Sequence, residues 1–198
     1  MQSEPILQDL MQALRCLPGV GQKSAQRMTF HLLERDRQGA FKLAQRLAEA
    51  VDKIGHCQTC QTLTSSVVCG LCSDQRRDQQ TLCIVETPAD VMAIESATSF
   101  KGVYFVLNGR LSPLDGLGPA EIGLDKLAGR IKQGTVNEII LATNPTVEGE
   151  ATAHYISEMA KKHQIVATRI AHGVPFGGEL EYIDSGTLSH AFSGRSKV

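Results

Sequence analysis

Two closely spaced pairs of cysteines constrain this chain more than any other feature. Each pair has the form C-x2-C, and eight residues separate the pairs, which consist of Cys57, Cys60, Cys69 and Cys72. One backbone turn within each pair can direct two sulfurs at the same ion, so the four thiolates match the tetrahedral coordination of Zn²⁺. Because every position is a cysteine, no coordination site is left for a substrate. We therefore expect one structural zinc ion per chain and no catalytic metal here.

The alternative for these cysteines is a pair of disulfides. Disulfides need an oxidising compartment, and we expect no secretory signal because the N-terminus lacks a charged segment followed by an apolar one. The two remaining cysteines, Cys16 and Cys83, lie among apolar neighbours and are predicted to be buried thiols in a reducing cytosol. No apolar run approaches the roughly 20 residues of a membrane span, so no membrane segment is expected.

The N-terminal third has the pattern of two helices joined by a tight turn. Apolar residues follow a helical period over 6–17, then Pro18-Gly19-Val20-Gly21 interrupts it, and a second helical pattern runs through Leu33. Gly19 and Gly21 would let backbone N–H groups face a phosphate, and Lys23 and Arg27 lie four residues apart on one helix face. This pattern predicts a helix-hairpin-helix that binds the DNA backbone irrespective of base sequence. A purely structural turn is the alternative.

The distribution of charged residues along the chain supports DNA binding more than the net charge does. The formal net charge of the 198 residues is -1. Between residues 15 and 46, however, bases outnumber acids; the bases are Arg15, Lys23, Arg27, Arg35, Arg37, Lys42 and Arg46, and the acids are Glu34 and Asp36. Such a local surplus is typical of a surface that faces phosphates, although a solvated helix face can show it too.

The second half alternates short apolar runs with helical patterns. Strands are predicted at 82–85, 103–107, 138–143 and 164–170, with helices beginning near 91 and 151 and a short last helix at 188–192. This alternation predicts an α/β fold with a mainly parallel sheet, whose functional residues lie at the carboxyl ends of the strands. Glu86 and the segment 144–150 fall there. An earlier helix over 41–51 and a polar linker over 73–80 complete the expected elements.

Five local motifs, in order, resemble those of one family, the bacterial recombination mediator RecR. They are L-P-G-V-G-x-K-S-A at 17–25, the four-cysteine motif, V-E-T-P-A-D at 85–90, L-S-P-L-D-G-L-G-P at 111–119 and G-G-E-L-E-Y at 177–182. The resemblance covers essentially the whole chain. It implies a multi-domain α/β protein with a helix-hairpin-helix domain at 1–54, a four-cysteine zinc finger at 55–78, a Toprim domain with a Rossmann-like parallel sheet at 79–172, and a Walker-B-like C-terminal tail for oligomerisation at 173–198.

The resemblance also implies a role and partners. Proteins similar to this one act in recombinational DNA repair in the bacterial cytoplasm, at the nucleoid. They work with RecO and RecF to load RecA recombinase onto gapped single-stranded DNA, and they assemble into homodimers or ring-like homotetramers that clamp DNA. By this resemblance Lys23 and Arg27 would face phosphates at junctions of single- and double-stranded DNA. Glu86 and Glu148 would form an acidic Toprim surface where a RecO-like partner and DNA meet.

The Toprim fold is shared with metal-dependent enzymes, so the chemistry must be argued from the site. Those enzymes hold Mg²⁺ with a glutamate after the first strand and a D-x-D pair after a later one. Here Glu86 is present, but the D-x-D position reads Asn144-Pro145-Thr146. We therefore predict no enzymatic activity, with weak Mg²⁺ binding left open. Glu148 and Glu150 could equally be acids favoured by a helix N-terminus.

Two other functions stay open on the sequence alone. The first is a Toprim-type metal-dependent nuclease, and the second is a zinc-stapled interaction scaffold that does not bind DNA. The chain has no G-x4-G-K-[ST] motif, so the Walker-B-like segment at 180–184 does not predict ATP hydrolysis.

Overall fold

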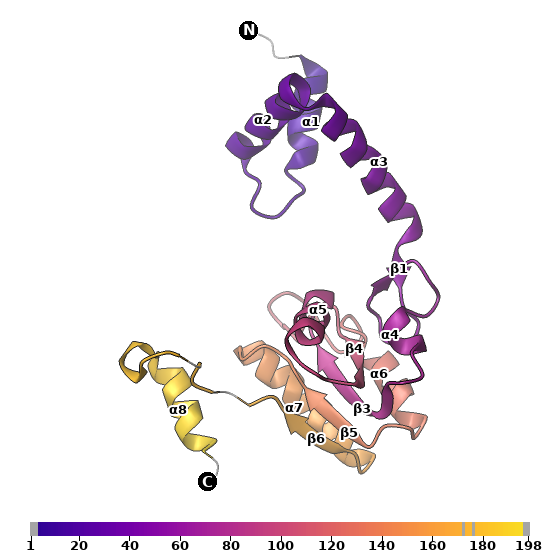
Figure 1. The fold of residues 1–198 in the computed structure, drawn as a ribbon, viewed down its shortest axis with the longest axis vertical. Coiled ribbons are helices and arrows are strands. Elements are labelled where there is room, and N and C mark those ends of the chain that lie inside the picture. Colours follow the sequence, from indigo (N-terminus) through magenta and orange to yellow (C-terminus); the bar gives the residue numbers. More distant parts are fainter. Residues whose placement is uncertain (1–3, 172, 176, 196–198) are drawn as a thin grey trace. The chain divides into compact units, whose positions relative to one another are not determined.

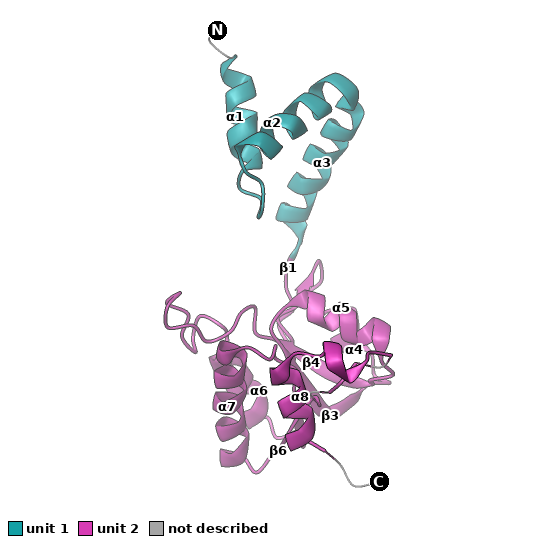
Figure 2. Cartoon of the chain, turned by 90° about the vertical axis from the view of Figure 1, so that its left-hand side faces the viewer, with its two compact units in different colours: residues 1–54 teal, residues 55–198 magenta. Residues whose placement is uncertain are grey.

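The computed structural model describes residues 4–171, 173–175 and 177–195, and the chain divides into two compact units. The first unit covers Met1–Ile54 and the second Gly55–Val198 (Figure 2). Position 172, the expected end of the Toprim domain, and positions 176 and 196–198 of the expected tail lie outside the described residues. Among the residues that are described, no helix is long and apolar enough to cross a membrane.

The first unit is helical (Figure 1). It comprises α1 (Pro5–Leu14), α2 (Gln22–Phe30), a π-helical turn η1 (His31–Arg35) and α3 (Arg37–Lys53). α1 ends at Leu14, three residues before the sequence predicts, because the next three N–H groups bond to carbonyls only three residues back. α3 begins earlier than predicted, since the Asp36 side chain caps it by accepting from the N–H of Gly39 at 2.8 Å. Cys16 is exposed, so the prediction that it is buried was wrong.

The second unit contains a four-stranded parallel sheet of order β4-β3-β5-β6, as the alternating pattern predicts (Figure 1). The strands are β3 (Asp78–Val85), β4 (Gly102–Val106), β5 (Glu138–Leu141) and β6 (Val166–Arg169). The helices between them are α5 (Pro88–Ala97), α6 (Leu124–Lys132) and α7 (Val147–Lys162), and the chain continues through η2 (Leu180–Tyr182) and α8 (Ser185–Ser193). The sequence analysis did not predict α6.

Both faces of the sheet are covered, which explains the uninterrupted apolar run in β3. Leu82 and Ile84 point to the larger core, where residues of α6 and α7 such as Leu127 and Ile156 pack. The alternate residues Cys83 and Val85 point to the other face, with Val91 and Tyr104. Strands buried on both faces are apolar at every position rather than at every second one. Cys83 is buried, as predicted, and this burial raises the pKa of its thiol to about 12.

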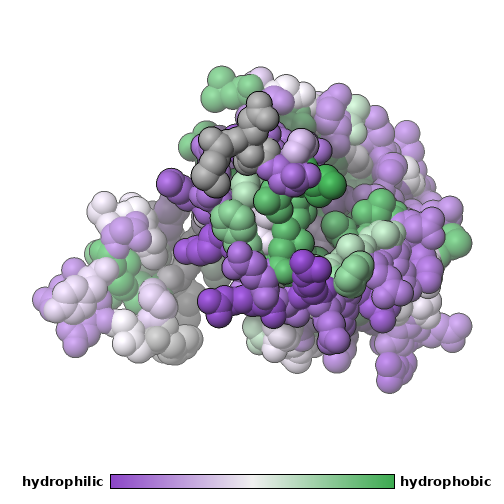
Figure 3. All heavy atoms as spheres, turned by 90° about the horizontal axis from the view of Figure 1, so that it is seen from above, coloured by the Kyte–Doolittle hydropathy of each residue, from purple (hydrophilic) through white to green (hydrophobic). Residues whose placement is uncertain are grey.

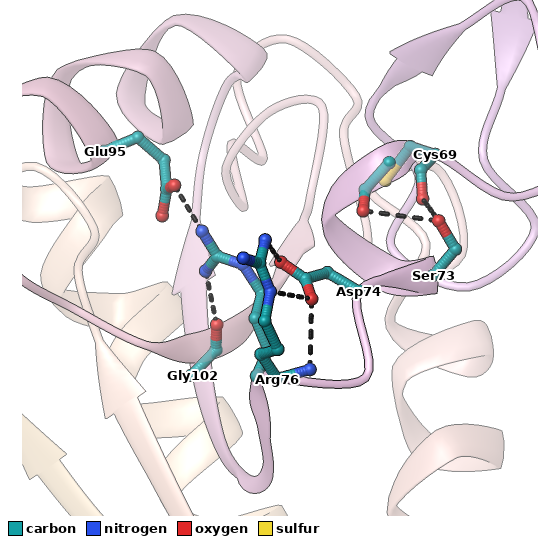
Figure 4. A network of polar contacts seen from close by, with 8 residues as sticks. Cys69, Ser73, Asp74, Arg76, Glu95 and Gly102 are labelled. Carbon is teal, nitrogen blue, oxygen red and sulfur yellow. Dashed lines mark hydrogen bonds and ion pairs between the residues drawn. The ribbon is translucent and has the colours of Figure 1, made fainter.

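The segment 73–80 is not a linker, which corrects the sequence prediction. β3 already begins at Asp78, and the preceding Arg77 is buried. Its guanidinium donates to the carbonyl of Gly102 at 2.7 Å and pairs with Glu95 of α5 (Figure 4). Glu95 also accepts from the hydroxyl of Tyr104 at 2.6 Å. A polar stretch without apolar period therefore anchors the first strand to its neighbours.

Candidate metal centre and nucleic-acid interface

The four cysteines predicted to bind zinc converge in a small knuckle at the start of the second unit. The knuckle pairs β1 (Gly55–His56) with β2 (Leu63–Thr64) and ends in the short helix α4 (Gly70–Ser73). All four Sγ atoms lie within 4.8 Å of one another. Three of the cysteines are buried and Cys72 is partly exposed.

The distances between the sulfurs fit a tetrahedrally coordinated ion and not a disulfide. The Sγ atoms of Cys60 and Cys69 are 3.5 Å apart. Zn–S bonds of about 2.3 Å in a tetrahedron place sulfurs about 3.8 Å apart, whereas a disulfide requires about 2.05 Å. All six cysteines are free thiols, which contradicts the disulfide alternative. A hydrogen bond from Cys72 lowers the pKa of the Cys60 thiol to about 5.

The backbone supports the sulfurs. The N–H of Cys69 donates to the Sγ of Cys57 at 3.3 Å. Gln61 adopts a positive φ of 64° at the turn, and its buried amide donates to the carbonyl of Cys57 at 3.0 Å. A residue in this left-handed conformation is uncommon, and the local hydrogen bonds hold it there. The chain thus prearranges the first C-x2-C pair.

The knuckle is docked on the edge strand of the Toprim sheet. The carbonyl of Cys60 accepts from the N–H of Val106 in β4 at 2.8 Å. From α6, Lys126 donates to the Gln61 side chain at 2.6 Å, and Arg130 donates to the carbonyls of Tyr104 at 2.7 Å and Thr59 at 3.4 Å. The zinc knuckle therefore covers part of an edge that would otherwise offer unpaired backbone groups. Arg130 also lies close enough to the four cysteines to interact with them electrostatically.

The helix-hairpin-helix motif presents the predicted basic residues to solvent. Gly19 has a φ of 76°, which only a glycine adopts at little cost, and Gly21 is the N-cap of α2. Lys23 and Arg27 are exposed on α2 and line a surface hollow together with His31, Phe30, Gln26, Glu34 and Arg35. No ion pair within the described residues engages Lys23 or Arg27. Both charges are available for an anionic partner.

The two Toprim acids lie in different environments. Glu86, at the carboxyl end of β3, is 3% exposed, and both of its oxygens accept hydrogen bonds from Asn144. Glu148 is partly exposed in the first turn of α7, where the side chain of Thr146 caps the helix. Glu86 therefore lies beneath the surface that we expected it to form. Glu150, the third acid of this region, pairs with Arg169 at 2.5 Å.

Comparison with known proteins matches most of the chain to four family models, three of them specific to RecR. The models of the RecR helix-hairpin-helix, the RecR four-cysteine zinc finger domain, the Toprim domain and the RecR C-terminal region match residues 7–51, 54–74, 80–171 and 173–196. Proteins named Recombination protein RecR from Xanthomonas campestris pv. campestris and Saccharophagus degradans are each 60% identical to it, over 193 and 194 residues and 98% of both chains. The chain belongs to the RecR family. A third RecR, from Methylococcus capsulatus, is 60% identical over 195 residues.

Family membership and structure together confirm the expected helix-hairpin-helix, zinc finger and Toprim modules. Sequence reasoning missed Lys126 and Arg130, which bind the zinc knuckle to the Toprim domain. It also missed Arg77, which connects β3 to β4 and α5. It noted Asn144 only because an asparagine stands there in place of the first aspartate of the D-x-D pair. The available signal was weak: Leu124, Leu127 and Ile131 have the spacing of a buried helix face, and they place Lys126 and Arg130 on the same helix.

Proposed function

We propose that this chain is a non-enzymatic, DNA-binding recombination mediator that acts with RecO and RecF to load RecA onto gapped single-stranded DNA. The observation that carries the proposal is the exposed basic face of α2, with Lys23 and Arg27 beside the glycine turn. Relatives that are 60% identical and bear the name of a recombination protein support it. Zinc held by the four cysteines would be structural, and the protein would work in the bacterial cytoplasm at the nucleoid.

The DNA contact is sequence-independent in this proposal. N–H groups around Gly19 and Gly21 and the positive end of the α2 dipole would meet one phosphate, and the two side chains would meet others. Contacts of this kind position a protein on DNA without reading bases. A mediator that must act at any gap needs this type of binding, at junctions of single- and double-stranded DNA.

We expect the double variant Lys23→Ala, Arg27→Ala to bind gapped DNA more weakly and with a flatter salt dependence. Each lost phosphate contact reduces the slope of log K against log salt by about 0.7–0.9, so the slope should fall by about 1.4–1.8. The measurement is a binding isotherm across a salt series, with and without a RecO-like partner. An unchanged slope in both conditions would contradict the proposed DNA surface.

A matched control exists in the same unit. Arg46 and Lys53 of α3 both pair with Glu49, so Arg46→Ala, Lys53→Ala removes the same charge from side chains that are already engaged in ion pairs. We expect this control to bind DNA with nearly the wild-type slope. Loading of RecA onto single strands coated with single-stranded-DNA-binding protein, with RecO and RecF present, should fall in the first variant and persist in the control.

We also propose that a second copy of the chain covers part of α3, which gives a homodimer or a tetrameric ring. None of the 17 residues of α3 is buried, although Leu43, Leu47 and Val51 follow each other at four-residue intervals on one face. Leu47 is 62% exposed and Val51 is 77% exposed. Figure 3 shows hydrophobic side chains on the surface among hydrophilic ones. An apolar helix stripe of this kind is typical of an interface, and a second copy is always present at equal concentration.

Leu47→Ser with Val51→Ser is expected to shift the chain from an oligomer to the monomer mass in size-exclusion chromatography with light scattering. Polar groups on this stripe weaken an apolar interface, and both positions are mostly exposed within the unit. Lys42→Ser, on another face of the same helix, should leave the mass unchanged. A double variant that keeps the wild-type mass at every concentration would refute this interface.

A further inference from the structure

The carboxyl ends of β3 and β5 bring Glu86 and Asn144 together, 58 residues apart in the chain. One carboxylate oxygen accepts from the backbone N–H of Asn144 at 2.8 Å, and the other accepts from its side-chain Nδ2 at 2.9 Å. A single residue thus donates to both oxygens of a carboxylate that is almost fully buried. β3 and β5 are neighbours in the sheet, and α7 follows directly after β5 (Figure 1).

The surrounding chain holds this pair tightly. The N–H of Thr146 donates to the Asn144 carbonyl at 2.8 Å, and the Thr143 hydroxyl donates to the Gly149 carbonyl at 3.0 Å. A Cβ atom on Gly149 would lie 2.1 Å from the Asn144 carbonyl oxygen and 3.0 Å from Oε1 of Glu86. The first turn of α7 therefore packs against the pair so closely that even a methyl group would clash with backbone.

These residues do not fit the divalent cation that the Toprim fold implies. Mg²⁺ requires near-octahedral oxygen coordination and usually keeps several waters. Both oxygens of Glu86 already accept N–H groups, Asn144 stands where enzymes of this fold have an aspartate, and Glu150 pairs with Arg169. Within the part of the chain that the structure describes, only the four cysteines form a cluster of three or more close metal-binding side chains.

We propose that Asn144 takes the place of a divalent cation at this edge of the sheet. Its two N–H groups satisfy the buried carboxylate of Glu86, as a cation would, and they join the ends of β3 and β5 without a metal. The hydrogen-bonded pair of Glu86 and Asn144 is then a metal-independent link between these two strand ends, which we call the closure. Asparagine and aspartate are nearly isosteric, so Asn144→Asp would replace a donor by a second carboxylate and convert the closure into a cation-dependent site.

The substitution Glu86→Gln distinguishes a hydrogen-bonded pair from a metal site, because it should change the stability of the fold in opposite directions in the two cases. In a metal site without its ion, neutralising one acid relieves repulsion and stabilises the fold. In a hydrogen-bonded pair, Glu86→Gln removes the negative charge that strengthens both hydrogen bonds, and its NH2 group faces the Nδ2 donor of Asn144 unless the Asn144 amide turns over. Charge-assisted hydrogen bonds are about twice as strong as neutral ones, so their loss destabilises the fold. We expect Glu86→Gln to lower Tm by about 4–8 °C in buffer without divalent cations.

The main experiment compares Asn144→Asp with wild type by thermal unfolding of the zinc-loaded protein. In cation-free buffer we expect a Tm about 4–8 °C lower for the variant, because two carboxylates then meet at hydrogen-bond distance. Millimolar Mg²⁺ should restore much of this loss, and it should leave the Tm of the wild type unchanged. Titration of Mn²⁺ followed by the EPR signal of the free ion should show binding by the variant and none by the wild type.

Asn137→Asp is the matched control, because it makes the same change at the other end of β5, where Asn137 donates to Gln80 at 3.0 Å. We expect its Tm to be insensitive to Mg²⁺. A wild-type Tm that rises with Mg²⁺, Mn²⁺ binding by the wild type, or a higher Tm for Glu86→Gln would each overturn the proposal. An Asn144→Asp protein that keeps its Tm in cation-free buffer would do the same. Should that variant not fold, the wild-type titration and Glu86→Gln still decide the question.

Discussion

Cys60→Ser is expected to lose the zinc ion and to unfold the knuckle. Beyond its sulfurs the knuckle has almost no apolar core, since only Leu71 packs beside the cysteines. In such small domains the metal supplies the folding free energy, about 10–16 kcal/mol in zinc-finger peptides. A serine hydroxyl does not ionise near neutral pH and is a poor zinc ligand, so most of this energy is lost.

The consequence extends beyond the knuckle, because Cys60 also accepts the hydrogen bond from Val106 on the edge strand β4. Unfolding the knuckle uncovers that edge, and exposed edges of sheets tend to pair with other chains. We therefore expect aggregation or misassembly in addition to lower stability. The measurements are zinc content by atomic emission, thermal unfolding and static light scattering. Zinc should fall well below one ion per chain, and Tm should fall by more than about 15 °C if a cooperative transition survives.

Cys16→Ser is the control for this variant. It removes one thiol from an exposed position in the other unit, so zinc content, Tm and assembly should match the wild type. A Cys60→Ser protein that retains one zinc ion per chain and a wild-type Tm would show that the four sulfurs do not form the metal centre. Slow extraction of zinc from the wild type by a chelator should reproduce the aggregation of Cys60→Ser without any substitution.

Features that depend on near neighbours in the sequence could be predicted, and those that depend on distant partners could not. The spacing of Cys57, Cys60, Cys69 and Cys72 was sufficient for the metal cluster, since one turn brings each pair together. The apolar runs were sufficient for a parallel sheet. The prediction of a buried Cys16 rests on local apolarity alone, whereas its exposure depends on which faces of α1 and α2 meet.

The Toprim acids illustrate the same limit. The position of Glu86 at a strand end follows from the pattern, but its burial follows from a partner 58 residues away. The sequence does not distinguish an acid that binds a metal at the end of a strand from one that accepts hydrogen bonds there. The prediction of a linker around Arg77 fails for a related reason. The polar residues around it have no period, and its partners, Glu95 and Gly102, lie 18 and 25 residues further on.

Arg77→Leu is accordingly expected to destabilise the Toprim unit by about 2–4 kcal/mol. The Arg77 side chain is 7% exposed and that of Glu95 is 28% exposed, so their pair is largely shielded from water. Removing one partner of a buried pair leaves the other charge uncompensated, which typically costs about 3–5 kcal/mol, and the residual exposure of Glu95 reduces this figure. The substitution also leaves the Gly102 carbonyl without its donor and removes the guanidinium 5.8 Å above the Tyr104 ring.

The pair also predicts a dependence on pH. Burial raises the pKa of Glu95, but hydrogen bonds from Tyr104 and Arg77 outweigh it and the pKa is lowered overall. A carboxyl whose pKa is lower in the folded state stabilises the fold above its unfolded pKa of about 4.3, and this contribution is lost as the pH falls through the folded pKa. The difference in stability between wild type and Arg77→Leu should therefore be full at neutral pH and should shrink in acid.

Arg76→Leu provides the control, because the side chain of this neighbouring arginine is 90% exposed and pairs with Asp74 across an exposed contact (Figure 4). Surface pairs of this kind contribute roughly 0–1 kcal/mol, so the control should unfold close to the wild type. Urea unfolding at neutral pH would measure both variants, with the expected loss for Arg77→Leu appearing as a lower midpoint at an unchanged slope. Equal stability of the two variants would mean that Arg77 is as dispensable as its exposed neighbour, and that β3 is held to β4 and α5 by its apolar residues alone.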